Sequence, residues 1–169
     1  MANFNVTGID GLELSMEDVM ELPEGVLLEM LRAEGEIVAD AQRRKIQSLN
    51  LVDSGQMLES ITVDKKLKSA GRYTGESIRY IDVYPRGKRK ETGGSAQKAT
   101  RKFKRRRKGA TERVRDVTNA EVAFENEFGV PGRGIAATLW MLSANEGAAD
   151  AAAEAAMKVY DRYLRSKNL

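Results

Sequence analysis

The feature that most constrains the fold is a block of thirty residues, 86–115, which carries fourteen lysines and arginines against two acidic residues. This block has almost no apolar side chains, so it cannot contribute to a hydrophobic core. A globular fold must therefore be built from the flanking parts of the chain, 22–85 and 117–169. We predict that residues 86–116 form a long, mobile basic loop inserted between them.

The acidic residues gather near the other end of the chain. Residues 1–40 carry ten acids and one base, so their formal charge is −9, whereas the block 86–115 carries +12. The remainder is balanced, and the net charge is only +3. Such a separation of acidic and basic residues along the chain gives information about binding partners rather than about the fold. We predict a single domain, 1–169, in which residues 1–21 are an acidic N-terminal extension.

The composition excludes several classes of enzyme. The chain has no cysteine and no histidine, which removes disulfides, thiolate metal sites and Ser/His/Asp or Cys/His catalysis. The carboxylate pairs Glu125/Glu127 and Glu17/Asp18 are of a suitable type for acid–base work, but a solvated strand end or helix face explains them. We predict a protein that is not an enzyme and has no cofactor and no metal.

The sequence also argues against a membrane or secreted protein. No apolar run approaches the roughly 20 residues that a membrane-spanning helix needs. The first residues lack the basic and apolar regions of a signal peptide. We therefore expect a soluble protein that is made inside a cell.

Two long helices are expected. Pro23 suits the first turn of a helix of about 25 residues, and apolar residues then recur at helical spacing along one face. These residues are Val26, Leu27, Met30, Leu31, Ile37, Val38 and Ala41. A second helical region follows Gly134, and its last part has small and aromatic residues on one face, which would let another helix approach closely. They are Ala152, Ala155, Ala156, Val159, Tyr160 and Tyr163.

Strand-like alternation appears in three places. It begins at Ile61, returns in Ser77–Tyr84 after a glycine-containing connection, and these two runs predict a hairpin that Pro85 closes. Val114, Val117, Val122 and Phe124 resume the alternation after the basic block. We predict an α+β fold: an antiparallel sheet of three or four strands, two long helices packed on one face, and the basic loop between strands.

The basic block is the strongest chemical signal, because lysine and arginine gain free energy from counterion release on nucleic acid. Only Phe103 interrupts its charges, which disfavours base stacking on single strands and favours contact with duplex phosphates. A solvated loop, or docking on an acidic surface such as residues 1–40 of a neighbouring copy, remains an alternative. The predicted contact residues are Lys88, Arg89, Lys90, Lys98, Arg101, Lys102, Lys104, Arg105, Arg106, Arg107 and Lys108.

The aromatic and large apolar residues of the C-terminal part are assigned to the core or to a subunit interface, which look alike in one sequence. The residues concerned are Trp140, Leu139, Tyr160 and Tyr163.

Three elements, in this order, resemble a known family: the long first helix, the segment 53–61 (DSGQMLESI), and the segment 123–129 (AFENEFG) before the closing helix. Together they are similar to the tail-component family of long-tailed bacteriophages, the proteins of tail completion and head–tail joining. The resemblance covers roughly residues 22–85 and 117–166. It departs from the family pattern at Val130, where threonine is usual, at residues 134–137 (GIAA), which replace an aromatic–proline element, and in the size of the basic insertion.

The resemblance implies a virion structural protein of the head–tail junction of a siphophage, in the neck connector, the tail-completion ring or the tail terminator. It implies a closed homo-oligomeric ring, which we expect to be a hexamer, joining capsid to tail around the genome channel. Adjacent connector, tail-tube or tail-terminator proteins would be its partners, with duplex DNA in the lumen, and it would be made in the host cytoplasm. Two other functions stay open: a non-enzymatic nucleic-acid-binding protein that uses loop 86–115, and a phage assembly chaperone.

Overall fold

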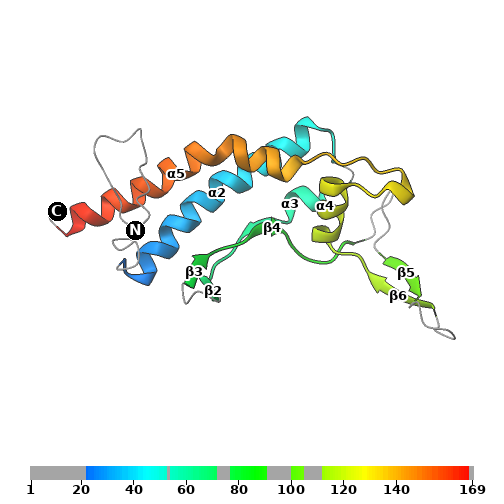
Figure 1. The fold of residues 1–169 in the computed structure, drawn as a ribbon, viewed down its shortest axis with the longest axis horizontal. Coiled ribbons are helices and arrows are strands. Elements are labelled where there is room, and N and C mark those ends of the chain that lie inside the picture. The colour runs from blue at the N-terminus through cyan, green and yellow to red at the C-terminus, as the bar shows by residue number, and fades with distance from the viewer. Residues whose placement is uncertain (1–21, 53, 72–76, 91–99, 105–111, 168–169) are drawn as a thin grey trace.

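The structure is a computed structural model that describes residues 22–52, 54–71, 77–90, 100–104 and 112–167. Two long helices, α2 (Glu24–Ser48) and α5 (Trp140–Ser166), lie against each other along the molecule, and the shorter elements lie beside them (Figure 1). The acidic extension predicted for residues 1–21 falls outside the described residues. Among the described helices, none is long and apolar enough to cross a membrane.

Helices α2 and α5 pack through small residues. The buried positions of α5 include Ala144, Ala148, Ala152 and Ala156, which recur every four residues and therefore lie on one face. Small side chains let two helix backbones approach closely. The predicted small-residue face is thus confirmed, and a hydrogen bond from Gln42 Nε2 to Asn145 Oδ1 (3.0 Å) adds a polar link between the two helices.

Helix α2 begins immediately after Pro23, as predicted. Its most buried positions differ in part from the expected apolar stripe, because they include Gly35, Ala39 and Gln42. A Cβ atom at Gly35 would lie 2.7 Å from Val63 Cγ1. The helix therefore approaches the neighbouring strand more closely than any larger side chain at that position would allow.

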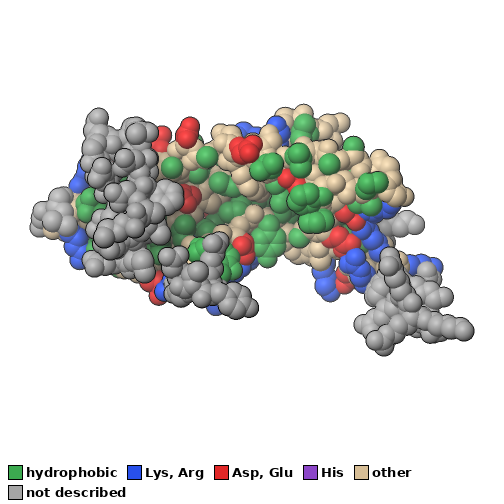
Figure 2. Space-filling model, viewed as in Figure 1, with side chains coloured by type: hydrophobic (Ala, Val, Ile, Leu, Met, Phe, Trp, Pro, Cys, Tyr) green, Lys and Arg blue, Asp and Glu red, His purple; other side chains and the backbone are tan. Residues whose placement is uncertain are grey.

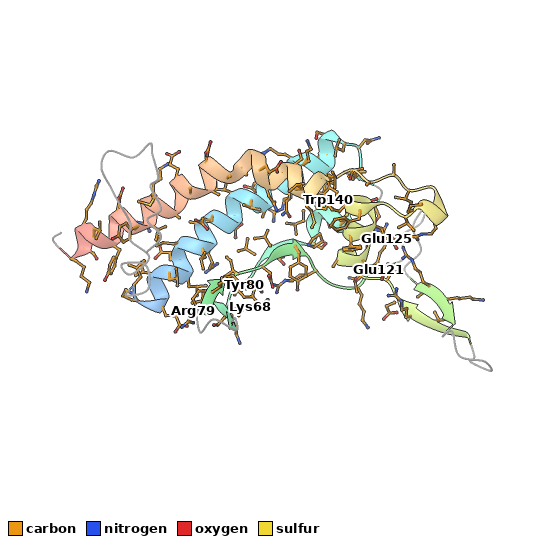
Figure 3. The ribbon with its side chains drawn as sticks, viewed as in Figure 1. Lys68, Arg79, Tyr80, Glu121, Glu125 and Trp140 are labelled. Atoms are coloured by element: carbon orange, nitrogen blue, oxygen red, sulfur yellow. The ribbon has the colours of Figure 1, made fainter. Side chains whose placement is uncertain are left out.

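The predicted hairpin is confirmed and forms one long ribbon. Its inner part pairs β1 (Ile61–Val63) with β4 (Val83–Pro85), and its outer part pairs β2 (Lys68–Gly71) with β3 (Ser77–Tyr80), both antiparallel. An ion cluster marks the junction of the two parts: Asp64 accepts a hydrogen bond from Arg86 and forms a salt bridge with Lys68, which also donates a hydrogen bond to Asp82. The labelled Lys68, Arg79 and Tyr80 mark the outer part of this ribbon in Figure 3.

The prediction of three or four strands in one sheet is wrong for the described residues, which form three separate two-stranded pairs. The segment expected to supply a further strand is a strand only at its start, where Val114 lies in β6 (Glu112–Asp116), and its later part is helix α4 (Asn119–Phe128). Thr118 caps this helix by accepting a hydrogen bond from Glu121 N (3.1 Å). Val122 and Ala123 are buried on one side of it, which explains the apolar content that resembled a strand.

The basic insertion is not an irregular loop throughout, which corrects a second expectation. Its strands β5 (Thr100–Lys104) and β6 (Glu112–Asp116) form the third antiparallel pair, a hairpin that projects from the body (Figure 1). Residues 91–99 and 105–111, which the prediction of a mobile loop also covers, lie outside the described residues.

The main hydrophobic core lies where the short elements meet the two long helices. Trp140 is fully buried there, and its Nε1–H donates to the Ala123 carbonyl oxygen (3.3 Å). The cluster consists of Ala39, Ile46, Met57, Ile61, Val117, Val122, Ala123 and Trp140. A smaller cluster of Met30, Ala156 and Val159 holds the far ends of α2 and α5 together. The short helices α3 (Gln56–Glu59) and η1 (Pro131–Arg133) complete the fold.

Candidate functional site

One of the predicted contact residues, Arg89, is buried. It is 5% exposed, its backbone N–H donates to the Val117 carbonyl oxygen (2.7 Å), and its Nη2 donates to Ser54 Oγ (3.0 Å). Its guanidinium therefore ties the start of the basic block to the segment that precedes α3. The position of Arg89 is structural, and its side chain does not lie on a surface where a partner could contact it.

The neighbouring lysines are exposed. Lys88 Nζ lies 2.7 Å from Asp116 Oδ2, and this hydrogen-bonded carboxylate raises the pKa of Lys88. Lys90 is held through its backbone: its N–H donates to Gln56 Oε1 (2.6 Å) and its carbonyl oxygen accepts from Gln56 Nε2 (2.8 Å). These contacts fasten the chain before it enters the hairpin.

Arg101 contacts α4 rather than solvent. It is paired directly with Arg115 across β5 and β6, and two like charges at opposite positions would repel each other. Glu121 removes that repulsion, because its carboxylate accepts hydrogen bonds from Arg101 Nη1 (2.8 Å) and from Arg115 Nη1 and Nη2 (2.7 and 2.6 Å). Hydrogen bonds between ionised groups are the stronger class of such bonds.

Glu125 extends the same network one helical turn further. It accepts from Arg101 Nη2 (2.6 Å) and also binds Arg133, which follows α4. Burial raises the pKa of Glu125, but the hydrogen bonds from Arg101 and Arg133 outweigh burial, so its pKa is lowered from its ordinary value. The same carboxylate raises the pKa of Arg101.

We call these five residues, Arg101, Arg115, Arg133, Glu121 and Glu125, the arginine latch. Glu121 and Glu125 lie on the side of α4 that faces the hairpin (Figure 3). The latch joins the base of the β5–β6 hairpin to α4 and so sets the direction in which the hairpin projects. The sequence analysis did not predict the latch, although helical i, i+4 spacing puts Glu121 and Glu125 on one face once the segment is known to be a helix.

Glu127 has a different role from its predicted partner Glu125. It is buried, and its carboxylate accepts hydrogen bonds from Met141 N (2.7 Å) and Leu142 N (3.1 Å) at the start of α5. A carboxylate at this place satisfies N–H groups that have no partner within the helix and interacts favourably with its positive end. Of the two explanations offered for this pair, the strand end is wrong, because both residues lie in helix α4. Glu125 does lie on a helix face, but it is bound to arginines there, and Glu127 is buried.

The remaining predicted contacts are placed only in part. Lys102 is exposed, and strand alternation puts it on the opposite face of the hairpin from Arg101, beside Val114. Lys104 is the last residue of β5. Lys98 and the run Arg105, Arg106, Arg107 and Lys108 lie outside the described residues.

The four residues predicted to lie in the core or at a subunit interface differ in their burial. Trp140 belongs to the main core, and Tyr160 packs against the smaller cluster of α2 and α5. Tyr163 is half-buried, with Lys167 Nζ 5.8 Å from its ring centroid. Leu139 is exposed, together with three other large apolar side chains near the junction of α4 and α5. We call this group of Phe124, Phe128, Leu139 and Leu142 the apolar surface.

Comparison with known proteins gives no relative: no protein-family model, no curated protein and no solved structure matches the chain. Within the described ranges, no group of three or more acidic side chains is placed to hold a metal ion.

Proposed function

We propose that the protein is a structural subunit of a bacteriophage head–tail connector or tail-completion ring. The observation that carries the proposal is the arginine latch, because it holds a basic hairpin at a fixed place outside the helical body. A subunit that joins two structures needs contact regions that are separated in space, and a hairpin that projects from the helical body (Figure 1) would supply one of them. The segments that resemble the tail-component family support the same reading.

The latch divides the basic block into two kinds of residue. Arg101 and Arg115 form salt bridges with Glu121, and these salt bridges position the hairpin. The cationic run that follows Lys104 in the sequence would carry the charge that a partner meets. In a ring, such an arm would reach an acidic surface of an adjoining protein or the phosphates of DNA in the channel.

The proposal is tested with purified protein and phage assembly intermediates. We expect the protein to form closed rings and to co-sediment with assembled tails or capsids. A protein that stays monomeric and binds neither tails nor capsids would contradict the proposal.

A nucleic-acid-binding protein that acts alone is the second candidate, and the charge of +12 over residues 86–115 favours it. Such a protein would bind duplex DNA without sequence specificity. If about six phosphates are neutralised, the logarithm of its affinity should fall with the logarithm of salt concentration at a slope near −5. Absent or salt-insensitive binding in a titration would remove this candidate.

A further inference from the structure

We infer that the apolar surface of α4 and the start of α5 binds a second copy of this chain. The inference rests on the proposed function, since it names a surface through which the subunits of the ring would associate. It is independent of the basic hairpin, which is held on α4 by the carboxylates of the arginine latch.

The apolar surface exposes four large side chains at neighbouring positions. Phe124 and Phe128 are 62% and 58% exposed, and Leu139 and Leu142 are 47% and 49% exposed. The two phenylalanine rings lie one helical turn apart, with their centroids 4.6 Å from each other. Figure 2 shows apolar side chains at the surface over α4 and the beginning of α5. Apolar residues scattered singly on a surface are normal, whereas a group of large exposed apolar side chains is often an interaction site.

Hydrogen bonds between α4 and α5 hold this surface in one arrangement. The last turn of α4 offers its carbonyl oxygens to the incoming chain: Asn126 O accepts from Thr138 N (3.0 Å), and Glu127 O accepts from Leu139 N (3.1 Å). In return, the Glu127 carboxylate accepts from Leu142 N. Both leucines are therefore fixed relative to α4, and a fixed surface loses little conformational entropy when it binds.

Leu139 adds an independent sign of functional constraint. Its backbone is in the left-handed region, with φ 48° and ψ 37°, which is unfavourable for a residue with a side chain of this size. Glycine or asparagine would adopt this conformation more easily. The chain instead keeps a large apolar side chain there and exposes it. Strained backbone positions of this kind cluster at functional sites. If the Leu139 side chain is buried against a partner, its contribution to binding would explain why a large apolar residue is kept at this position.

The size of the surface fits a subunit contact. A buried aromatic side chain contributes about 150–250 Å², so the exposed parts of these four side chains come to roughly 300–400 Å². This is about half of the roughly 800 Å² that each partner buries in a standard interface. The apolar centre of such an interface is surrounded by a polar rim.

The charges beside the surface favour a second copy over a nucleic acid. Glu121 and Glu125 lie on the same helix as the two phenylalanines, and both are neutralised by arginines of their own chain. A neighbouring copy can therefore cover this surface without meeting an unpaired carboxylate of Glu121 or Glu125. An exposed apolar group next to carboxylates offers nothing to a phosphate backbone.

The experiment compares the full chain with the double variant Phe124→Ser/Phe128→Ser by sedimentation velocity over a range of concentrations. We expect the wild type to associate and the variant to associate at least roughly tenfold more weakly, as for the loss of an interface hot spot. The matched control is Ile78→Ser, which removes an exposed apolar side chain from β3 and should leave association unchanged. Because all three side chains are exposed in the monomer, the melting temperatures should stay close to that of the wild type.

The outcomes separate the inference from the proposed function. If the wild type and the double variant associate equally, the inference is overturned and the ring proposal stands. A wild type that remains monomeric at every concentration overturns both. Amide hydrogen exchange gives a second measurement that needs no variant: residues 124–142 should gain protection as the wild-type concentration rises, and unchanged protection in an associating protein would overturn the inference.

Discussion

Glu127 shows how much of this structure depends on single side chains that the sequence does not distinguish. Three glutamates lie within seven residues of α4, yet one is buried and caps a different helix while two bind arginines of the hairpin. Their partners lie 6 to 24 positions away along the chain, and a single sequence does not show which of those segments will meet α4.

We predict that Glu127→Ala lowers the free energy of unfolding by about 2–4 kcal/mol. The change leaves two N–H groups at the start of α5 without their acceptor and removes a charge near the helix end. Urea or thermal denaturation measures the loss. Glu146→Ala on the exposed side of α5 is the control and should change stability by less than about 0.5 kcal/mol. Equal effects of the two changes would show that the cap does not stabilise α5.

Gly129 gives a second prediction at this scale. Its φ is +73°, and a Cβ atom there would lie 2.7 Å from Ala137 N and 2.8 Å from Ile135 O. Gly129→Ala should therefore destabilise the protein by about 2 kcal/mol or more. Gly132→Ala is the matched control, because nothing lies within 4 Å of the added atom. A melting temperature that is equally unaffected by both substitutions would contradict the backbone geometry of this turn.

At the scale of elements, regular periodicity predicted the two long helices and the first hairpin, whereas it misassigned α4. The apparent strand alternation in this segment spans the start of α4 at Thr118, because it combines residues before the helix with residues inside it. These residues are Val114, Val117, Val122 and Phe124. Thr118 and Glu121 have the spacing of a capping box, which is a signal for a helix start that the sequence did contain. Burial of Gly35 and Gln42 in α2 was not predictable, since it follows from close approach of other elements and not from their own hydrophobicity.

The arginine latch is tested by removing its carboxylate charges. Glu121→Gln/Glu125→Gln should loosen the hairpin base, because neutral amides bind guanidinium groups less strongly than carboxylates do. Hydrogen exchange in residues 100–104 and 112–116 should become faster, while the melting temperature changes little, as is usual for partly exposed ion pairs. Glu154→Gln, which removes an exposed pair with Lys158, should leave the hairpin unchanged. Unaltered exchange in the double variant would contradict the latch.

The ribbon junction should respond to acid. Hydrogen bonds from Lys68 and Arg86 lower the pKa of Asp64 in the folded protein. A lowered carboxyl pKa stabilises the folded state above the unfolded pKa of about 3.9, and this contribution is lost as pH falls through the folded value. Stability measured against pH should therefore fall below about pH 4 less steeply in Asp64→Asn than in the wild type. An identical acid limb in both proteins would show that this cluster does not contribute.

At the scale of the whole molecule, the net charge of +3 hides two oppositely charged segments, because residues 1–40 carry −9 and residues 86–115 carry +12. The structure places part of the basic block on a projecting hairpin, and two arginines of this hairpin, Arg101 and Arg115, bind Glu121 of α4. The apolar surface lies on that same helix. One short helix therefore carries both the attachment of the arm and the surface that we assign to a second copy.

Electron microscopy of the purified full-length protein tests the central claim most directly. The account predicts closed rings with a fixed number of subunits, which we expect to be six, in which the apolar surface of each copy is covered by its neighbour. Particles that are only monomers, or open filaments in which the apolar surface stays uncovered, would contradict it.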